Sequence, residues 1–466
     1  MQRITGLISA ICNFFWGDLI VLPLPGGGSL GISLLVLILV PAGLYFTIRT
    51  RFLPIRLFPE MLRISLEKQS GDRKGALSGM QALIVSTATR VGMGNMVGVV
   101  AAIAAGGAGA AFWMWVTALI GCSTAFVEAT LAQLHNEPDP LYGGKRGGPA
   151  QYIHAFFTRK TGRRFSVIAA LFALSGLLCW CGVSQVISNS VSSAFENAFS
   201  VPPIVSTVIL VALAAVVVLR KNTTVRVLDV VVPVMAAFYF CIAIFVTVKN
   251  AALLPQVLRR ILEEAFGIRQ VVAGGFGAAL MNGVKRGLFS NEAGSGSAPC
   301  AAAGAVVSHP AKTGLFQAFG VFIDTIVICT CTAMIILLAP QEALAGQEGM
   351  GLLQAAMGCH FGKAGVVFTA VALWLFSFTT FIGILYYARS NVAYLFGDSW
   401  RSQTAYKLLA LVMLFIGGLA TLTFVWELAD IGIALMTVFN MVCILPMGGR
   451  ALRCLEEYTA LPKDKR

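Results

Sequence analysis

Long apolar stretches separated by polar loops dominate the pattern of this chain. A membrane-crossing helix needs roughly 20 apolar residues, because each residue adds about 1.5 Å to the helix. By this measure the predicted spans are residues 30–48, 82–105, 112–134, 166–195, 204–219, 228–248, 271–290, 313–339, 364–395, 405–423 and 425–446. The expected fold class is an all-α polytopic membrane protein with about eleven transmembrane helices.

The second stretch differs from a plain apolar helix, because it carries Arg90, Asn95 and glycines that include Gly92 and Gly94. Each glycine lowers helix propensity by about 1 kcal/mol, so the backbone can open here. Open backbone at membrane depth is tolerated where it lines a cavity or lies buried in protein. An opened helix offers N–H groups to an anion and carbonyls to a cation. A glycine-rich packing seam is the alternative.

A second glycine-interrupted segment begins at residues 273–277 and runs to Ser297. Each interrupted segment opens a set of five predicted spans, and five is odd, so the two halves insert with opposite orientation. Interrupted segments in corresponding positions indicate inverted repeats with a binding site near the midplane. We therefore divide the chain into an N-terminal segment with one extra helix and a basic loop (1–80), two five-helix repeats (81–250 and 251–446) and a tail (447–466).

Composition and charge agree with a membrane location. Only 12% of residues are charged and the mean hydropathy is +0.81, whereas soluble domains carry about 25% charged residues. Most Lys and Arg residues fall in alternate loops, namely 49–76, 137–165, 220–226, 285–312, 389–407 and 447–466. The positive-inside rule then predicts an outside N-terminus and an inside C-terminus. The net charge of +13 faces anionic lipid, so the bilayer is the expected partner and nucleic acid is not.

Motifs for catalysis or ATP use are not present in the sequence. It contains no HExxH motif, no convincing nucleophile–base pair and no phosphate-binding GxxxxGK[ST] loop. The cysteines lie mostly in apolar spans and the four histidines are scattered, which argues against a disulfide framework or a metal cluster. We therefore expect neither an enzyme nor an ATP-driven pump.

Several polar residues at membrane depth are candidates for function. Glu128 and Asp324 are ionisable groups inside spans and are functional candidates by default, although Glu128 equally fits a helix-packing role. The polar stripe containing Gln185 and Asn189 suits either a cavity wall or hydrogen bonds between helices. The hydroxyl cluster at 377–380 offers hard ligands for Na⁺, or bonds to its own helix carbonyls.

Four stretches together resemble the alanine/glycine:cation symporter family, also called the sodium:alanine symporters. They are Gly92-Met-Gly-Asn95 followed by Gly106-Gly-x-Gly-Ala-x-Phe-Trp-Met-Trp115, Gly147-Gly-Pro-x-x-Tyr-Ile153, Arg286-Gly-Leu-Phe-Ser-Asn-Glu-Ala-Gly-x-Gly-Ser-Ala-Pro299, and Phe322-Ile-Asp-Thr325. The resemblance extends from about Asn13 to the C-terminus. It implies the leucine-transporter-type inverted-repeat core and cation-driven import of small neutral amino acids in the bacterial cytoplasmic membrane.

The resemblance also implies where ions and substrate bind. The implied Na⁺ ligands are the carbonyls of Ala88, Val91 and Phe376 and the hydroxyls of Thr379 and Thr380. The substrate carboxylate would meet N–H groups near Gly92, Gly94 and Asn95, and its ammonium would meet carbonyls at Gly275, Phe276 and Gly277. Gln185, Asn189 and Phe381 would form the walls. Arg90, Asp324 and Glu128 are the expected coupling or gating residues.

This chain departs from the family pattern next to the implied site. Arg90 and Met93 stand where the family usually has threonines, residues 187–190 read Ile-Ser-Asn-Ser, and Ile384 replaces a usual tryptophan. A guanidinium is always charged, so Arg90 could take the place of the coupling cation and make transport independent of Na⁺. Binding of a substrate carboxylate by Arg90 is the alternative. A sensor that has lost transport is a further alternative.

Overall fold

Helices make up most of the described chain, and its strands are short. The computed structural model describes residues 2–23, 29–66, 77–78, 84, 92–162, 164–220, 224–268 and 275–462. The first half contains α1 (Gln2–Trp16), β1 (Ile20–Pro23), β2 (Ser29–Ile32), α2 (Leu34–Arg49), α3 (Leu53–Arg56), α4 (Phe58–Leu66), β3 (Leu77–Ser78), η1 (Gly94–Gly98), α6 (Val99–Gly106), α7 (Gly109–Leu134), β4 (Glu137–Pro138), β5 (Lys145–Arg146), α8 (Pro149–Thr161), α9 (Val167–Phe199), α10 (Pro203–Val218) and α11 (Thr224–Lys249). The second half contains η2 (Ala251–Leu253), α12 (Leu254–Ala265), α13 (Gly275–Asn291), α14 (Pro299–Ala302), β6 (Ala305–Val306), α15 (Pro310–Val321), η3 (Phe322–Cys329), α16 (Thr330–Leu337), α17 (Gln341–Leu344), α18 (Met350–Phe361), α19 (Lys363–Phe396), α20 (Trp400–Gly417) and α21 (Leu422–Ala460).

Six helical stretches of the described chain are long and apolar enough to cross a membrane: Gly109–Leu134, Val167–Phe199, Val232–Lys249, Pro310–Leu337, Lys363–Phe396 and Leu422–Ala460. Shorter apolar helices cover Gly6–Trp16, Leu34–Arg49, Gly94–Gly106 and Pro203–Val218. The all-α membrane class is confirmed, while the count of eleven spans stays a prediction. The last predicted span, 425–446, lies within α21, which continues as helix to Ala460 in the expected tail.

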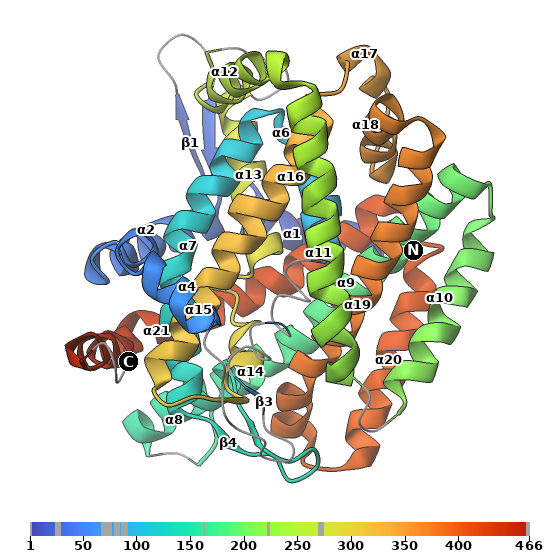
Figure 1. Ribbon diagram of the computed structural model, residues 1–466. Helices are drawn as coiled ribbons and strands as arrows, with labels where there is room; N and C mark the ends of the chain where they lie inside the picture. The colour runs from blue at the N-terminus through green and yellow to red at the C-terminus, as the bar shows by residue number, and fades with distance from the viewer. Residues whose placement is uncertain are drawn as a thin grey trace.

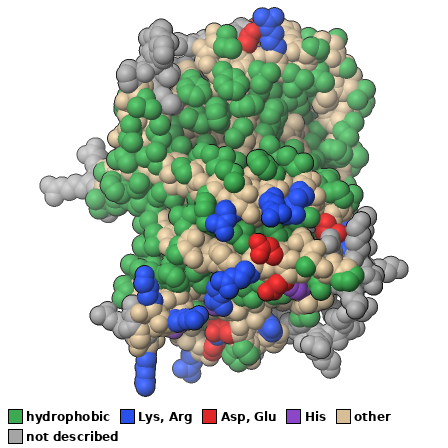
Figure 2. Space-filling model, turned by 90° about the vertical axis from the view of Figure 1, so that its left-hand side faces the viewer, with side chains coloured by type: hydrophobic (Ala, Val, Ile, Leu, Met, Phe, Trp, Pro, Cys, Tyr) green, Lys and Arg blue, Asp and Glu red, His purple; other side chains and the backbone are tan. Residues whose placement is uncertain are grey.

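The segments between the long helices gather at two ends of the molecule (Figure 1). The helices α12, α17 and α18 lie at one end, and α8, α14 and the β4–β5 hairpin lie at the other. These are the segments that the charge pattern assigns to opposite sides of the membrane. On the face in Figure 2, hydrophobic side chains cover the upper part, while most charged side chains lie over the lower half.

The N-terminal segment is helical and packs against the protein. The Trp16 side chain is buried and its indole N–H donates to the Asp430 carbonyl of α21 at 3.1 Å. Trp16 therefore fixes the end of α1 against α21. The following β1–β2 hairpin, with Ile20 opposite Ile32, is absent from the sequence prediction.

The two interrupted helices are placed differently from the prediction. The first contains the π-helix η1, which leads into α6, while residues 85–91 lie outside the described part. The second runs unbroken as α13 through Gly275–Asn291 and is interrupted only over residues 292–298. Glycines within α13 permit close packing instead of unwinding: a Cβ on Gly283 would come within 2.5 Å of the Trp113 Cβ on α7. The observed break therefore lies at the far end of the predicted segment, which runs from 273–277 to Ser297, and residues 273 and 274 lie outside the described part.

Candidate functional site

A small buried cavity of about 30 Å³ lies where the two interrupted helices meet. A space of this size holds one or two water-sized groups. Side chains from η1, α9, α13, α19 and α21 enclose it. The lining residues are Met93, Gly94, Cys179, Trp180, Val183, Phe289, Glu292, Ser297, Thr380, Ile384 and Ile433.

The first break meets α19 beside this cavity. The Met93 N–H donates to the Thr380 hydroxyl at 3.2 Å, and the Thr380 hydroxyl donates to the Phe376 carbonyl at 2.8 Å. The Thr379 hydroxyl donates to the same carbonyl at 2.9 Å. The structure thus brings three of the expected Na⁺ ligands together at the first break. Both hydroxyls bond to a carbonyl of their own helix, which is the alternative given above for this hydroxyl cluster. Binding of Na⁺ by these residues therefore stays a prediction.

The remaining expected ligands, Ala88 and Val91, lie outside the described residues, as does Arg90. Gly92 is described and its carbonyl accepts from the Asn95 N–H at 3.3 Å. Gly94 lines the cavity, in agreement with its expected place near the substrate. The expected anion contacts at Gly92 and Gly94 themselves stay a prediction.

The second break is held in place by buried hydrogen bonds. Glu128 of α7 accepts from the Gly294 N–H at 3.2 Å and from the Asn440 side-chain amide at 2.8 Å. The same Asn440 amide donates to the Gly294 carbonyl at 3.0 Å, and the Tyr152 hydroxyl donates to the Asn440 carbonyl oxygen. Glu128 therefore satisfies backbone that the broken helix leaves without its usual partners.

A separate polar cluster surrounds Asp324 behind the first break. One oxygen of this fully buried carboxylate accepts from the Ser290 hydroxyl at 2.9 Å and from the Thr325 hydroxyl at 2.6 Å. The Asn95 amide donates to the Asp324 carbonyl at 3.0 Å. The cluster joins both interrupted helices to the π-helix η3, and its hard oxygen atoms suit a small monovalent cation or a proton. Asn95 thus faces Asp324. It is not one of the described residues that line the cavity.

The expected wall residues on α9 face a different helix. Gln185 donates to the Met413 sulfur at 3.3 Å, and Asn189 donates to the carbonyls of Gly417 at 3.3 Å and Ala420 at 2.7 Å. The polar stripe therefore holds α9 against α20. This agrees with the second expectation for the stripe, hydrogen bonds between helices. Residues advance about 100° along a helix, so the opposite face of α9 supplies the described cavity residues Cys179, Trp180 and Val183.

The other expected wall and ammonium residues also lie elsewhere. Phe381 is buried in α19, while its neighbours Thr380 and Ile384 are the described residues of that helix that reach the cavity. Gly275, Phe276 and Gly277 begin α13, about 25 Å along the helix from its broken end. Phe276 packs on the Trp113 ring at a centroid distance of 5.9 Å. These residues therefore lie away from the described cavity lining, and their expected roles in substrate binding stay predictions.

The sequence reasoning did not identify Glu292 as a site residue. Its signal was available, since Glu292 is an ionisable residue inside the longest matching motif, Arg286 to Pro299, next to a predicted break. The cavity faces of Trp180 and Ile433 carried no comparable signal. Apolar residues on a membrane helix look alike in sequence whether they face lipid, a neighbour or a cavity.

A buried ion-pair group lies on one side of the cavity. Asp430 of α21 pairs with Lys285 at 2.7 Å and with Arg286 at 3.1 Å. The Arg286 guanidinium lies 3.9 Å from the centre of the Trp426 ring, and Trp426 packs on the cavity residue Phe289 at 4.8 Å. The group therefore contacts the cavity wall through two aromatic rings.

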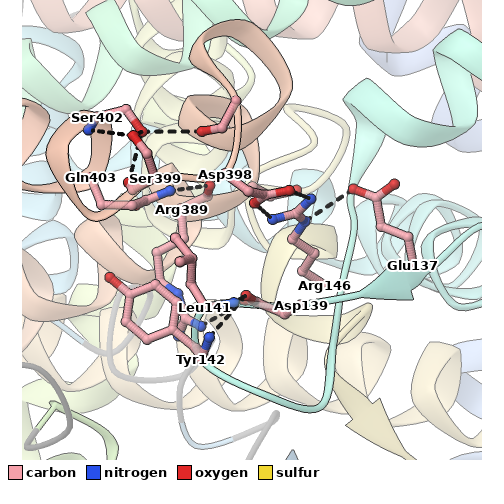
Figure 3. Close-up of polar contacts among 12 residues, drawn as sticks. Glu137, Asp139, Leu141, Tyr142, Arg146, Arg389, Asp398, Ser399, Ser402 and Gln403 are labelled. Carbon is pink, nitrogen blue, oxygen red and sulfur yellow. Dashed lines mark hydrogen bonds and ion pairs between the residues drawn. The ribbon is translucent and has the colours of Figure 1, made fainter.

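A second ion-pair group ties the β4–β5 hairpin to α19 and the α19–α20 turn (Figure 3). Arg389 pairs with Asp139 at 2.8 Å, and Arg146 pairs with Glu137 at 3.0 Å and with Asp398. The hydrogen bonds from Arg146 lower the pKa of the Asp398 carboxyl below its usual value. This group closes the end of the molecule that the charge pattern assigns to the cytoplasm.

Two interrupted helices that meet at a buried cavity within an apolar helical bundle define the class of secondary transporters. The sodium:alanine symporter family model matches residues 27–466. The chain belongs to the sodium:alanine symporter family, as the sequence motifs indicated.

Relatives with assigned names cover nearly the whole chain. The chain is 41% identical to the probable sodium/glutamine symporter GlnT of Bacillus subtilis over 92% of this chain and 89% of that protein. It is 41% identical to the amino-acid carrier protein AlsT of the same organism over 92% and 90%. It is 30% identical to the sodium/alanine symporter AgcS of Methanococcus maripaludis over 98% of each.

Solved structures support the fold at lower identity. MhsT in complex with L-phenylalanine matches with a TM-score of 0.55 and 13% identity, covering 82% of this chain and 89% of that one. A manganese transporter of Eremococcus coleocola matches with a TM-score of 0.52 and 14% identity, covering 83% and 81%. The leucine-transporter-type fold expected from the motifs is thereby confirmed.

Proposed function

We propose that this protein imports small neutral amino acids by Na⁺ symport with alternating access. The observation that carries the proposal is the buried cavity between the two helix breaks, lined by hydroxyls, one carboxylate and apolar side chains. Val183, Ile384 and Ile433 suit an uncharged aliphatic side chain. Relatives named for sodium-coupled glutamine and alanine transport support the same substrate class and ion.

The proposal includes the architecture and orientation of the transporter. Residues 81–250 and 251–446 form two repeats of opposite orientation, and their relative motion opens the cavity to each side in turn. The N-terminus lies outside and the C-terminus inside the bacterial cytoplasmic membrane, because basic residues gather in the loops on the C-terminal side. We propose no enzymatic activity.

Uptake by purified protein in liposomes tests the proposal. Labelled alanine, glycine and glutamine are supplied with an inward Na⁺ gradient or with choline in place of Na⁺. Symport predicts accumulation that requires the gradient and is abolished by an ionophore that dissipates it. A protein that accumulates none of a full panel of neutral amino acids under any gradient would refute amino-acid transport.

A second candidate, Na⁺-independent transport, rests on Arg90. The family usually has threonine at this position, and Arg90 lies in the predicted span that contains the first break. A permanent guanidinium charge could replace a coupling cation. On this candidate, uptake persists in choline, and Arg90→Thr creates a Na⁺ requirement. Wild-type uptake that collapses without Na⁺ leaves symport as the function.

A further inference from the structure

Glu292 occupies an unusual place in the molecule. It is the first residue of the second break, its side chain is 9% exposed, and it lines the cavity. Among the described residues that line the cavity, it is the only Asp, Glu, Lys or Arg. A carboxylate at membrane depth is costly, so a side chain kept there generally has a function.

The backbone at Glu292 is held in a conformation that usually belongs to glycine. Its φ is +56°, and the glycines that follow at 294 and 296 have φ of +92° and +83°. A left-handed conformation is energetically unfavourable for a residue other than glycine. Such strain persists only where the surroundings impose it, and it concentrates at functional sites.

Hydrogen bonds on both sides impose this conformation. The Glu292 N–H donates to the Leu288 carbonyl at 2.9 Å. The Glu292 carbonyl accepts from the Ser295 hydroxyl at 2.7 Å and from the Ser295 N–H at 3.2 Å. Two residues further on, Glu128 and Asn440 bind the Gly294 backbone. The carboxylate is therefore positioned in the cavity by a rigid segment.

We propose that Glu292 recognises the ammonium group of the amino-acid substrate, an inference that rests on the proposed function and deepens it. An ammonium group has three donors and no acceptor. The Glu292 carboxylate and the hydroxyls of Ser297 and Thr380 are acceptors on the cavity wall. The other lining side chains are mostly apolar. Under the proposed function the substrate is a neutral amino acid, so the cationic group that it presents to these acceptors is its α-ammonium.

The test compares alanine with lactate, which has a hydroxyl in place of the ammonium on the same carbon skeleton. Uptake of labelled L-alanine into liposomes is measured with each compound as competitor. In the wild type, we expect unlabelled alanine to inhibit about 10- to 100-fold more strongly than lactate. Charge-assisted hydrogen bonds are worth about 10- to 100-fold in affinity. Glu292→Gln should therefore raise the KM for alanine by about that factor, and the alanine-to-lactate ratio should fall toward one.

Two further variants separate recognition from folding. Glu292→Asp keeps the carboxylate and should retain the preference for alanine with a raised KM. Glu196→Gln makes the same chemical change at an exposed position of α9 and should leave both quantities unchanged. If Glu292→Gln fails to fold, the alanine-to-lactate inhibition ratios of the wild type and of Glu292→Asp decide the question. A wild type that accepts lactate as well as alanine overturns the proposal.

The proposed transport function and the proposed role of Glu292 can be refuted separately. Wild-type protein that takes up no neutral amino acid would overturn the proposed transport function. A wild type that transports alanine while folded Glu292→Gln keeps its KM and its discrimination would overturn only the assignment of Glu292.

Discussion

Ile384 shows how one replacement can set the size of a binding site. It stands where the family usually has tryptophan, and its side chain is 2% exposed on the cavity wall. A branched aliphatic side chain is smaller than an indole, and buried interiors have little empty space to absorb the difference. This residue should therefore determine which substrate side chains fit.

We expect the wild type to prefer a neutral amino acid larger than glycine, and Ile384→Trp to shift the preference toward glycine and alanine. A competition panel against labelled alanine measures the ranking. Val371→Trp, on a 43% exposed position of the same helix, should leave the ranking unchanged. A wild type restricted to glycine and alanine, or an unchanged ranking in Ile384→Trp, would contradict the assignment.

Substitution of Thr379 and Thr380 tests the expected Na⁺ site, also at the scale of single residues. The double change to alanine removes two expected ligands, and the α19 backbone keeps its helical hydrogen bonds. Na⁺-stimulated uptake should therefore disappear while the folded protein remains. Thr369→Ala removes a hydroxyl with the same kind of contact, to the Gly365 carbonyl at 2.8 Å, and should have no such effect. Full Na⁺ dependence in the double variant would remove both residues from the site.

At the scale of elements, the two breaks are stabilised by groups from other helices. Glu128 and Asn440 come from α7 and α21, and Tyr152 comes from α8. Three elements thus fix the segment that carries Glu292. Sequence analysis identified Glu128 from its depth alone, and the tertiary structure shows which backbone it binds.

Glu128→Ala should destabilise the protein, because it removes the acceptor of the buried Gly294 N–H and one of the two acceptors of the Asn440 amide. Hydrogen bonds to charged groups are worth about 1.5–3 kcal/mol, so the midpoint of thermal unfolding in detergent should fall measurably. Combining Glu128→Ala with Asn440→Ala should cost less than the sum of the single changes, because the two residues share one network. Additive effects would mean that the two side chains act independently.

At the scale of the whole molecule, the polar segments sort into two ends, and the charge pattern assigns them to opposite sides of the membrane (Figure 1). Cys359 of α18 is exposed at the end assigned to the outside. It offers a natural chemical probe of orientation.

A membrane-impermeant maleimide should label Cys359 in intact cells, and Cys359→Ser should remove that label. Lys160→Cys, in α8 at the opposite end and combined with Cys359→Ser, should react only after the cells are permeabilised. Labelling of Lys160→Cys in intact cells, with protection of Cys359, would reverse the proposed orientation.

Sequence by itself determined the membrane class, the approximate limits of the long helices and the family, because these depend on the length and order of apolar stretches and on local motifs. It also located Gly94, Thr380 and Ile384 beside the site. It could not determine which face of a helix meets the cavity, because that depends on how the helices pack together. Gln185 and Asn189 therefore turned out to bind α20, while Trp180 and Val183 of the opposite face line the cavity.

Only the tertiary structure decided where the second helix breaks. Glycines signal that a backbone can open or pack closely, and the choice depends on what lies against them. In α13 they meet α7, so the helix stays intact past Gly283. The break occurs instead where Glu128 and Asn440, distant in sequence, can satisfy the freed backbone, and this is what places Glu292 in the cavity.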